Sequence, residues 1–157
     1  MKKIILDKTL IGKKYPVINF DVEIEILRLF SKATGQEDPI YFNEEAARKE
    51  GYPSILAPPT FLIAVAMRQK NPYLYLTDLN VPIGRILHAN QEYSYFSPIH
   101  AGDQLKMDSR IDNIFDKKNG ALQFVSFFSV YTNQNNLKVA ESISTVVVRW
   151  KILRTWN

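Results

Sequence analysis

The sequence contains no cysteine, which excludes disulfide bonds, cysteine nucleophiles and thiolate metal sites. It has only two histidines, His88 and His100, and neither belongs to a cluster of carboxylates and histidines at metal-ligand spacing. We therefore expect no metal and no organic cofactor. The 20 Lys and Arg outnumber the 16 Asp and Glu, but the positive charges are scattered along the chain. A nucleic-acid partner is not expected, because such proteins gather their charge on one face.

Long apolar runs are also missing. No stretch approaches the roughly 20 apolar residues that a membrane-spanning helix needs. Asp7 and Lys8 interrupt the first apolar run, Ile4 to Leu6, too early for the hydrophobic region of a signal peptide. With 157 residues, of which 46% are hydrophobic, the chain is expected to form a single domain over residues 1–157. We expect a cytoplasmic protein without a membrane anchor.

The first half of the chain is predicted to be helical. Asp21 can cap a helix that Gly35 ends. Its apolar residues follow helical spacing and are Val22, Ile26, Leu29, Phe30 and Ala33. Asn43 can cap a short helix that stops at Gly51, and a third helix is expected to begin at Pro58 and run through TFLIAVAMRQ. This last helix has almost no polar face, which predicts burial beneath a sheet.

The second half alternates with the period of β-strands. Strands are predicted at 87–96, 104–111, 122–132 and 139–153, with a short one near 15–20. Turns are expected at Asn119-Gly120 and at 133–136. The segregation of helices and strands predicts an α+β fold, with one antiparallel sheet wrapped around the central apolar helix.

Two of these strands carry unusual faces. Strict alternation in 87–96 puts Leu87, Ala89, Gln91, Tyr93 and Tyr95 on one face and His88 with Asn90, Glu92 and Ser94 on the other. In 122–132 both faces are apolar, with Phe124 and Phe128 on one and Val125 and Phe127 on the other. An apolar second face suggests an oligomer interface, and irregular burial within a monomer is the alternative.

Three motifs together resemble one family. They are TGQEDPIYFNEEAARKEGY, ILAPPTF and LHANQEYSYFSPIHAGDQL. The sequence resembles the MaoC-like dehydratases, specifically the N-terminal-type hydratase domain that is also a separate subunit of (3R)-hydroxyacyl-ACP dehydratases. The resemblance extends from Gly12 to Trp150. It implies a hot-dog fold and reversible hydration of a trans-2-enoyl thioester to a (3R)-3-hydroxyacyl thioester, the reaction of a hydro-lyase in fatty-acyl metabolism.

Active members of that family resemble the pattern GD-x-NP-[aliphatic]-H, whose Asp and His share a water. The resemblance places Gln36 at the Asp position and Tyr41 at the His position, while Pro39 and Ile40 match. An amide cannot strongly polarise water, and a tyrosine with an ordinary pKa near 10 is a poor base at neutral pH. Fold and ligand class agree with the family, whereas independent catalysis does not.

Three residues offer substitute acid–base groups. In a dry cleft Glu37 or Asp38 could gain a raised pKa and serve as a base; the alternative is a pair of solvated acids, with Asp38 starting a turn before Pro39. His88 is either a base or a hydrogen-bonded side chain on the polar face of its strand. Gln91 is expected to tie its strand to the loop around Gln36, with ligand contact as the alternative.

The start of the third helix offers donors for the thioester oxygen. Pro58 and Pro59 lack N–H groups, so Ala57, Thr60 and Phe61 carry the first available donors. Loop carbonyls or water could satisfy them instead. The side chains of Phe61 and Tyr93 belong either to the core or to the lining of an acyl tunnel.

Three hypotheses follow. The first is a non-catalytic, acyl-binding subunit that is inactive without a catalytic hot-dog partner. The second is an active homodimeric hydratase or thioesterase that uses Glu37, Asp38 or His88. The third is a binding protein for acyl-CoA or acyl-ACP without chemistry of its own. In each, the ligand is an acyl-CoA or acyl-ACP thioester and the chain forms a homodimer or heterodimer.

Overall fold

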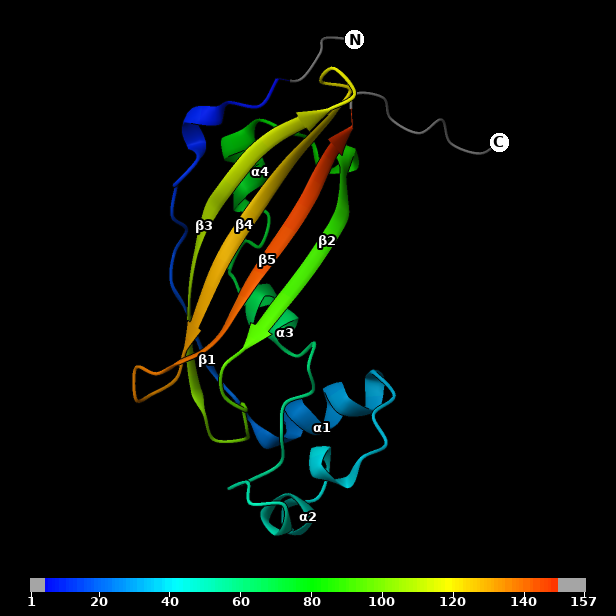
Figure 1. The fold of residues 1–157 in the computed structure, drawn as a ribbon, viewed down its shortest axis with the longest axis vertical. Helices are drawn as coiled ribbons and strands as arrows, with labels where there is room; N and C mark the ends of the chain where they lie inside the picture. Colours follow the sequence, from blue (N-terminus) through cyan, green and yellow to red (C-terminus); the bar gives the residue numbers. More distant parts are fainter. Residues whose placement is uncertain (1–4, 150–157) are drawn as a thin grey trace, which may run out of the picture.

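The computed structural model describes residues 5–149 (Figure 1). The helices are η1 (Lys8–Leu10), α1 (Ile24–Ala33), η2 (Pro39–Tyr41), α2 (Glu44–Lys49), α3 (Leu62–Met67), α4 (Leu74–Leu79) and η3 (Ile83–Arg85). The strands are β1 (Ile18–Asp21), β2 (Ile86–Tyr95), β3 (Gln104–Lys117), β4 (Leu122–Thr132) and β5 (Lys138–Arg149). The five predicted strands are all present. Residues 150–153 of the last predicted strand lie outside the described part of the chain.

The strands form one antiparallel sheet in the order β1-β3-β4-β5-β2. Tight turns join β3 to β4 and β4 to β5, as the sequence predicts. Asn119, Gly120 and Asn136 adopt the positive φ angles that such turns require. This order leaves β1 and β2 as the two edge strands.

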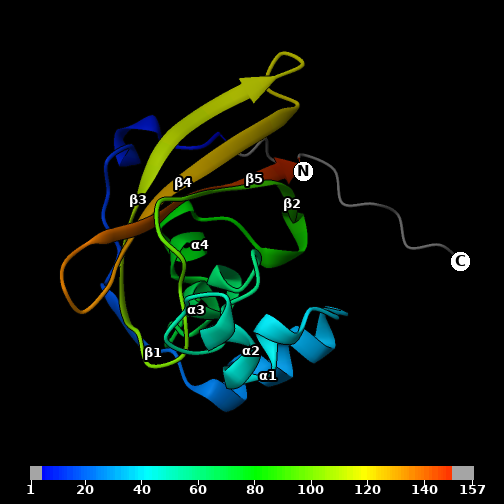
Figure 2. The same cartoon turned by 60° about the horizontal axis from the view of Figure 1, so that its bottom comes forward.

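The helices form a second layer on one face of the sheet. Figure 2 shows the sheet curling over α3 and α4, with α1 and α2 grouped at one end. The predicted helix from Pro58 begins only at Leu62, because the N–H of Phe61 donates to the Pro58 carbonyl and closes a turn. It is also not buried on all sides, since Ile63 is 41% and Met67 50% exposed.

The first two helices follow the sequence signals only in part. Asn43 caps α2, because its side chain accepts a hydrogen bond from the N–H of Ala46. The predicted cap at Asp21 is wrong. Asp21 ends β1, where it pairs with Gln104, and α1 begins three residues later. Leu29, predicted on the apolar face of this helix, is exposed.

A β-bulge changes the expected faces of β2. His88 pairs with Val146 and Asn90 with Thr145, so Ala89 is an extra residue that reverses the alternation. Cross-strand partners share a face, so His88 lies with Val146 on the concave face. Gln91, Tyr93 and Tyr95 lie on that face too, opposite Ser144, Ser142 and Ala140. The prediction that His88 occupies the opposite face is wrong, and Leu87 takes the outer face instead.

The core consists of two hydrophobic clusters. One surrounds the start of α3 and includes Phe61 and Leu62 together with Leu27 and Tyr131. The other lies beneath α4, and its buried residues are Leu6, Leu76, Leu79, Val81, Ile111, Ile114, Val125, Val146 and Val148. Between them the concave face carries serines, including the buried Ser129 and Ser142. The core is therefore interrupted by a polar band across the sheet.

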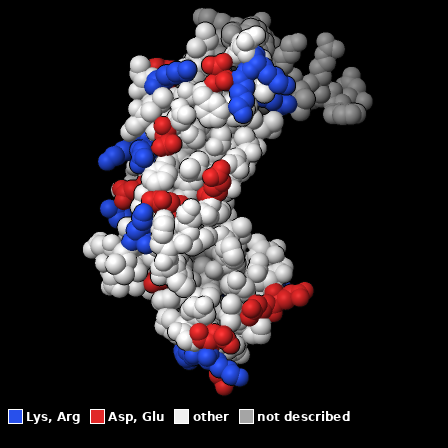
Figure 3. Space-filling view, in the orientation of Figure 1, with Lys and Arg blue, Asp and Glu red and all other residues white. Residues whose placement is uncertain are grey.

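The outer face of the sheet carries aromatic side chains together with cations. Arg110 lies 4.5 Å from the ring centre of Phe128, and Lys117 lies 5.5 Å from that of Phe124. Figure 3 shows positive and negative side chains interspersed over this face. An oligomer interface at β4 stays a prediction. No helix within residues 5–149 is long and apolar enough to cross a membrane.

Candidate functional site

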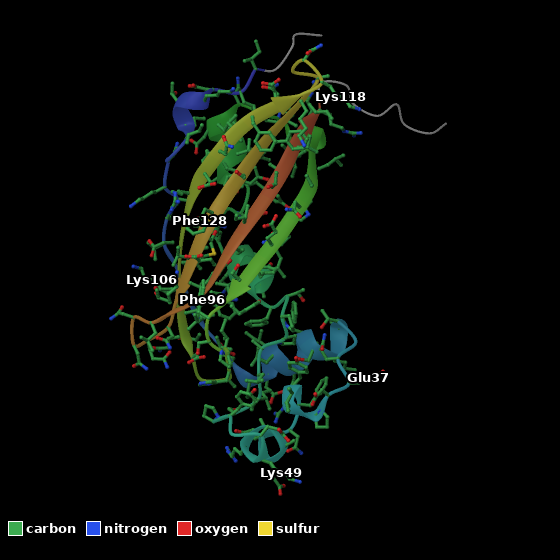
Figure 4. The ribbon with its side chains drawn as sticks, viewed as in Figure 1. Glu37, Lys49, Phe96, Lys106, Lys118 and Phe128 are labelled. Atoms are coloured by element: carbon green, nitrogen blue, oxygen red, sulfur yellow. The ribbon has the colours of Figure 1, made fainter. Side chains whose placement is uncertain are left out.

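The loop between α1 and α2 carries the four residues on which the predicted chemistry depends. The Asp38 carboxylate accepts a hydrogen bond from the N–H of Ile40 at 3.0 Å and so caps η2. Glu37 is exposed, and Figure 4 shows it on the outer side of the loop, away from the sheet. Gln36 and Tyr41 are half-buried, and their side chains have no hydrogen-bond partner within residues 5–149. Asp38 therefore has the turn-forming role.

Backbone hydrogen bonds fix this loop beside the segment that leads to α3. The N–H of Leu56 donates to the Ile40 carbonyl at 3.1 Å, and Arg28 Nε donates to the Phe42 carbonyl at 3.2 Å. The N–H of Asn43 closes the loop on the Pro39 carbonyl at 2.8 Å. The loop thus keeps a defined position next to the start of α3.

The three predicted donors at the start of α3 differ in availability. The N–H of Ala57 donates to the Ile99 carbonyl at 2.8 Å, and that of Phe61 donates to the Pro58 carbonyl at 2.9 Å. These two groups are therefore not free, and for them the alternative of donation to neighbouring carbonyls is the one observed. The N–H of Thr60, an exposed residue, has no acceptor in the described part of the chain. Of the three predicted donors, Thr60 is therefore the one whose N–H has no protein acceptor within residues 5–149.

Tyr95 holds the turn before α3 in place. Its hydroxyl donates to the carbonyl of Pro59, which links the end of β2 to the start of α3. Burial raises the pKa of Tyr95, so this hydroxyl keeps its proton at neutral pH. A pocket of about 350 Å³ opens beside this link. Its lining consists of Leu56, Ala57, Pro59, Tyr95, Phe96, Ser97, Pro98 and Ile99.

Two of the predicted lining residues belong mainly to the core. Phe61 is fully buried, and its ring packs edge-on against Phe20 and Phe30, with centroid distances of 5.8 and 5.4 Å. Tyr93 is partly buried against the same cluster, and burial raises the pKa of its phenol to about 12. Neither ring lines the pocket at the start of α3 or the second cavity between sheet and helices.

That second cavity, of about 210 Å³, lies between the sheet and the chain segment that joins α3 to α4. His88, Ser109, Ser129 and Ser144 contribute polar groups to it. The remaining lining residues are Tyr15, Ile63, Ala66, Met67, Gln69, Pro72, Tyr73, Leu74, Tyr75, Met107, Phe127 and Val146. The cavity occupies the polar interruption between the two core clusters.

The structure does not bring the substitute acid–base groups together. His88 precedes Tyr95 by seven residues, which at about 3.3 Å per residue separates them by about 20 Å of strand. Tyr95 contacts the start of α3, beside the loop that holds Glu37 and Asp38, so His88 lies far from both acids. The expected hydrogen bond between Gln91 and the Gln36 loop is absent among residues 5–149.

The Ala101-Gly102-Asp103 motif has a structural role, which is to connect two loops. Asp103 is 3% exposed and accepts hydrogen bonds from the N–H of His100 at 3.0 Å and from Gln134 Nε2 at 3.1 Å. It therefore joins the loop before β3 to the loop before β5. No group of three or more potential metal ligands occurs within the described residues.

Two features of the site are absent from the sequence predictions. The hydrogen bond from Tyr95 has no sequence signal beyond the tyrosine pair of EYSYF. The serines of the cavity do have one, because Ser109, Ser129 and Ser144 each interrupt an apolar alternation in a separate strand. Strand register, which brings them side by side, comes only from the fold.

Comparisons with known proteins agree with this arrangement. The family described as "FAS1-like, dehydratase domain region" matches residues 9–142. A UPF0336 protein of Saccharopolyspora erythraea is 31% identical over 145 residues, covering 92% of each chain.

Solved structures show the same fold. A chain of the C-terminally truncated HadBC complex, a (3R)-hydroxyacyl-ACP dehydratase of Mycobacterium tuberculosis, is 28% identical with a TM-score of 0.70, and the match covers 85% of this chain and 92% of that one. A MaoC-like dehydratase is 23% identical with a TM-score of 0.80, and the match covers 89% of this chain but 42% of that one. These matches confirm the predicted hot-dog fold.

Proposed function

The chain belongs to the FAS1-like dehydratase-region family of MaoC-like hot-dog proteins, and from that premise we propose that it is the non-catalytic, acyl-binding subunit of a two-subunit (3R)-hydroxyacyl-thioester dehydratase. One observation carries the proposal. The loop is held beside the start of α3 by the Leu56–Ile40 hydrogen bond, but its two expected acid–base positions hold Gln36 and Tyr41.

In the proposed enzyme, the groups that the reaction needs come from two different chains. Hydration needs a base that activates water for attack at C3 and an acid that protonates C2. It also needs a donor for the negative charge that develops on the thioester oxygen. A partner with an intact Asp and His supplies the first two groups. In this chain the free N–H of Thr60 is the candidate for the third, and the pocket beside Tyr95 receives the thioester end of the substrate.

The alternative of an independently active enzyme has less support. Asp38 is engaged as a cap, Glu37 is exposed, and His88 lies about 20 Å along β2 from Tyr95. His88 is therefore too far from either acid to share a water with it. A base that acts alone in an open loop has no partner to orient the water or to deliver the second proton.

The edge of the sheet offers a place for the partner. β2 is a ten-residue edge strand that hydrogen-bonds only to β5 within the described chain. It contains no Lys, Arg or Pro, which are the residues that commonly protect an edge from pairing. The related HadBC protein is a complex of two different subunits. An edge-to-edge contact along β2 would bring a partner close to both the Tyr95 pocket and His88.

The experiment that tests the proposal combines this protein with a MaoC-like subunit that carries an intact GD-x-NP-[aliphatic]-H loop, ideally the one encoded beside it. Loss of enoyl absorbance is followed with crotonyl-CoA and dodecenoyl-CoA for each protein alone and for the mixture. We expect turnover by the mixture to exceed that of the partner alone, and a stable complex on gel filtration. A mixture no more active than the partner would contradict the proposal.

Variants of the edge strand provide the matched control. Ala89→Lys places a charge on the exposed bulge of β2, whereas Ala121→Lys makes the same change in the exposed β3–β4 turn. The first is expected to prevent complex formation and the gain in activity, and the second is expected to leave both unchanged. Equal behaviour of the two variants would exclude β2 as the contact.

A further inference from the structure

The cavity between the sheet and the α3–α4 connection has a polar floor, formed by serines that lie side by side on neighbouring strands. Ser109 pairs with Ser129, and Ser129 with Ser142, so three serines form a row across β3, β4 and β5 on the concave face. In the next row Ser144 pairs with Phe127 on one side and Gln91 on the other. Of these serines, Ser109, Ser129 and Ser144 line the cavity directly.

Several polar groups of this floor have hydrogen-bonding capacity to spare. The Ser142 hydroxyl lies 3.3 Å from the Tyr131 hydroxyl and is occupied by it. The hydroxyls of Ser109 and Ser144 and the ring of His88 have no hydrogen-bond partner within residues 5–149. A hydroxyl beside an apolar ligand loses the water it would otherwise bind, which is unfavourable unless the ligand replaces that bond.

The opposite wall of the cavity is mostly apolar. It is formed by Ile63, Ala66 and Met67 from α3 and by Tyr73 and Leu74 at the start of α4. Its one amide side chain, Gln69, donates to the Ala66 carbonyl at 2.9 Å. Ile63 and Met67 are partly exposed, and His88 lies on the exposed edge strand. The cavity is therefore reached from the side on which β2 ends the sheet. Figure 3 shows the outline of the molecule drawn inward on that side.

From this one-sided lining we propose that the cavity binds an acyl chain that carries an oxygen function, a hydroxyl or keto group, along its length rather than a plain alkyl chain. The inference rests on the proposed acyl-binding function and names its substrate class. The oxygen would exchange hydrogen bonds with Ser109, Ser144 or His88, while the methylene groups contact Ile63 and Met67. Sites of this kind, mostly apolar with a few convergent polar groups, derive their specificity from those groups.

The test is calorimetric binding to the full-length protein. The probes are octanoyl-pantetheine and its terminally hydroxylated analogue, which lack the double bond and cannot react. A hexanoyl and a decanoyl pair extend the comparison to other positions of the hydroxyl. We expect one hydroxylated probe to bind about tenfold more tightly than its alkyl counterpart, the factor given by roughly one additional hydrogen bond.

Variants of the lining residues identify which side chain gives the preference for the hydroxylated probe. Ser109→Ala and Ser144→Ala remove one hydroxyl each and are expected to reduce the preference to about twofold or less for at least one of them. Ser94→Ala removes an exposed hydroxyl from the outer face of β2 and should leave the preference unchanged. Met67→Trp narrows the opening of the cavity and should weaken binding of both probes of a pair.

The outcomes distinguish an error in the inferred preference for an oxygen function from an error in the proposed acyl-binding function. Alkyl probes that bind as tightly as hydroxylated ones, or a preference that survives Ser109→Ala, Ser144→Ala and His88→Ala alike, would overturn the inference while leaving the acyl-binding function intact. Absence of binding by every probe would contradict the acyl-binding function itself. Thermal unfolding of each variant, followed by circular dichroism, identifies any loss that comes from misfolding.

Discussion

The loop at 34–43 and the start of α3 lie side by side but are built differently. The loop is held largely by local contacts, such as the cap that Asp38 makes on Ile40. The start of α3 is held by long-range ones, from the Ala57 N–H to Ile99 and from the Tyr95 hydroxyl to Pro59. Under the proposed function, the first region lacks the acid–base pair that catalysis requires, and the second supplies the groups that bind the thioester.

In the proposed function, this difference would allow catalysis to be lost while binding persists. Gln36 and Tyr41 are half-buried, and their side chains have no hydrogen-bond partner in the part of the chain that the structure describes, so exchanging them disturbs little of the fold. The start of α3 is joined to β2 by the Tyr95 hydrogen bond, to β1 by the contact between the Phe20 and Phe61 rings, and to the core by the buried Phe61. Its geometry therefore persists as long as the protein folds. Binding and catalysis therefore depend on regions with different structural constraints.

The largest effect is expected from a substitution of Phe61 at the start of α3. Phe61→Ala removes a fully buried ring, and we expect it to lower the free energy of unfolding by about 3–5 kcal/mol. Phe96→Ala makes the same change at an exposed ring stacked by Lys138 and should cost about 1 kcal/mol or less. Urea denaturation measures both. Similar losses would show that the start of α3 is not anchored in the core.

The second prediction concerns a double variant that places an Asp and a His at the two acid–base positions of the loop. If the loop has kept its geometry, Gln36→Asp combined with Tyr41→His should give the isolated protein a crotonyl-CoA hydration rate about 10²-fold above the background rate of a heat-inactivated sample, the lower range of general acid–base catalysis. Each single variant should stay near the parent rate, since the two groups act on one water. A folded but inactive double variant would mean that the loop has lost its catalytic geometry.

A smaller effect is expected where β2 meets α3. Tyr95→Phe removes the hydroxyl that holds the Pro59 carbonyl, so the turn that presents the Thr60 N–H becomes more mobile. We expect kcat of the two-subunit mixture to fall roughly five- to tenfold, corresponding to the loss of about one hydrogen bond, with little change in complex formation. Unchanged kcat would remove Thr60 and its turn from the proposed mechanism.

The smallest effect concerns alkaline stability. Burial raises the pKa of Tyr93 to about 12, above the usual value near 10. The contribution of this phenol to the free energy of unfolding is complete below about pH 10. It declines as the pH rises toward 12, because Tyr93 loses its proton at a lower pH in the unfolded chain than in the folded protein. Tyr93→Phe should therefore lose less stability than the parent across this range, measured by urea midpoints. An identical alkaline decline would contradict burial of this phenol.

The sequence predicted most of the framework for identifiable physical reasons. Alternating apolar residues and turn residues such as Asn119-Gly120 predicted the strands, and Asn43 predicted the start of α2. The bulge at Ala89 has no comparable signal, so the face of His88 was predicted wrongly. The loss of Ala57 and Phe61 as free donors also depends on tertiary hydrogen bonds. Helix α4 was not predicted, because its segment LYLTDL is short and follows Asn71-Pro72.

The most direct test of the central claim is the hydration rate of the purified protein alone, followed as loss of enoyl absorbance with crotonyl-CoA and dodecenoyl-CoA. The account predicts no turnover above that of a heat-inactivated sample, because Gln36 and Tyr41 occupy the two acid–base positions and His88 lies far from Glu37 and Asp38. Turnover by the protein alone that disappears in the combined Glu37→Gln, Asp38→Asn and His88→Ala variant would contradict it.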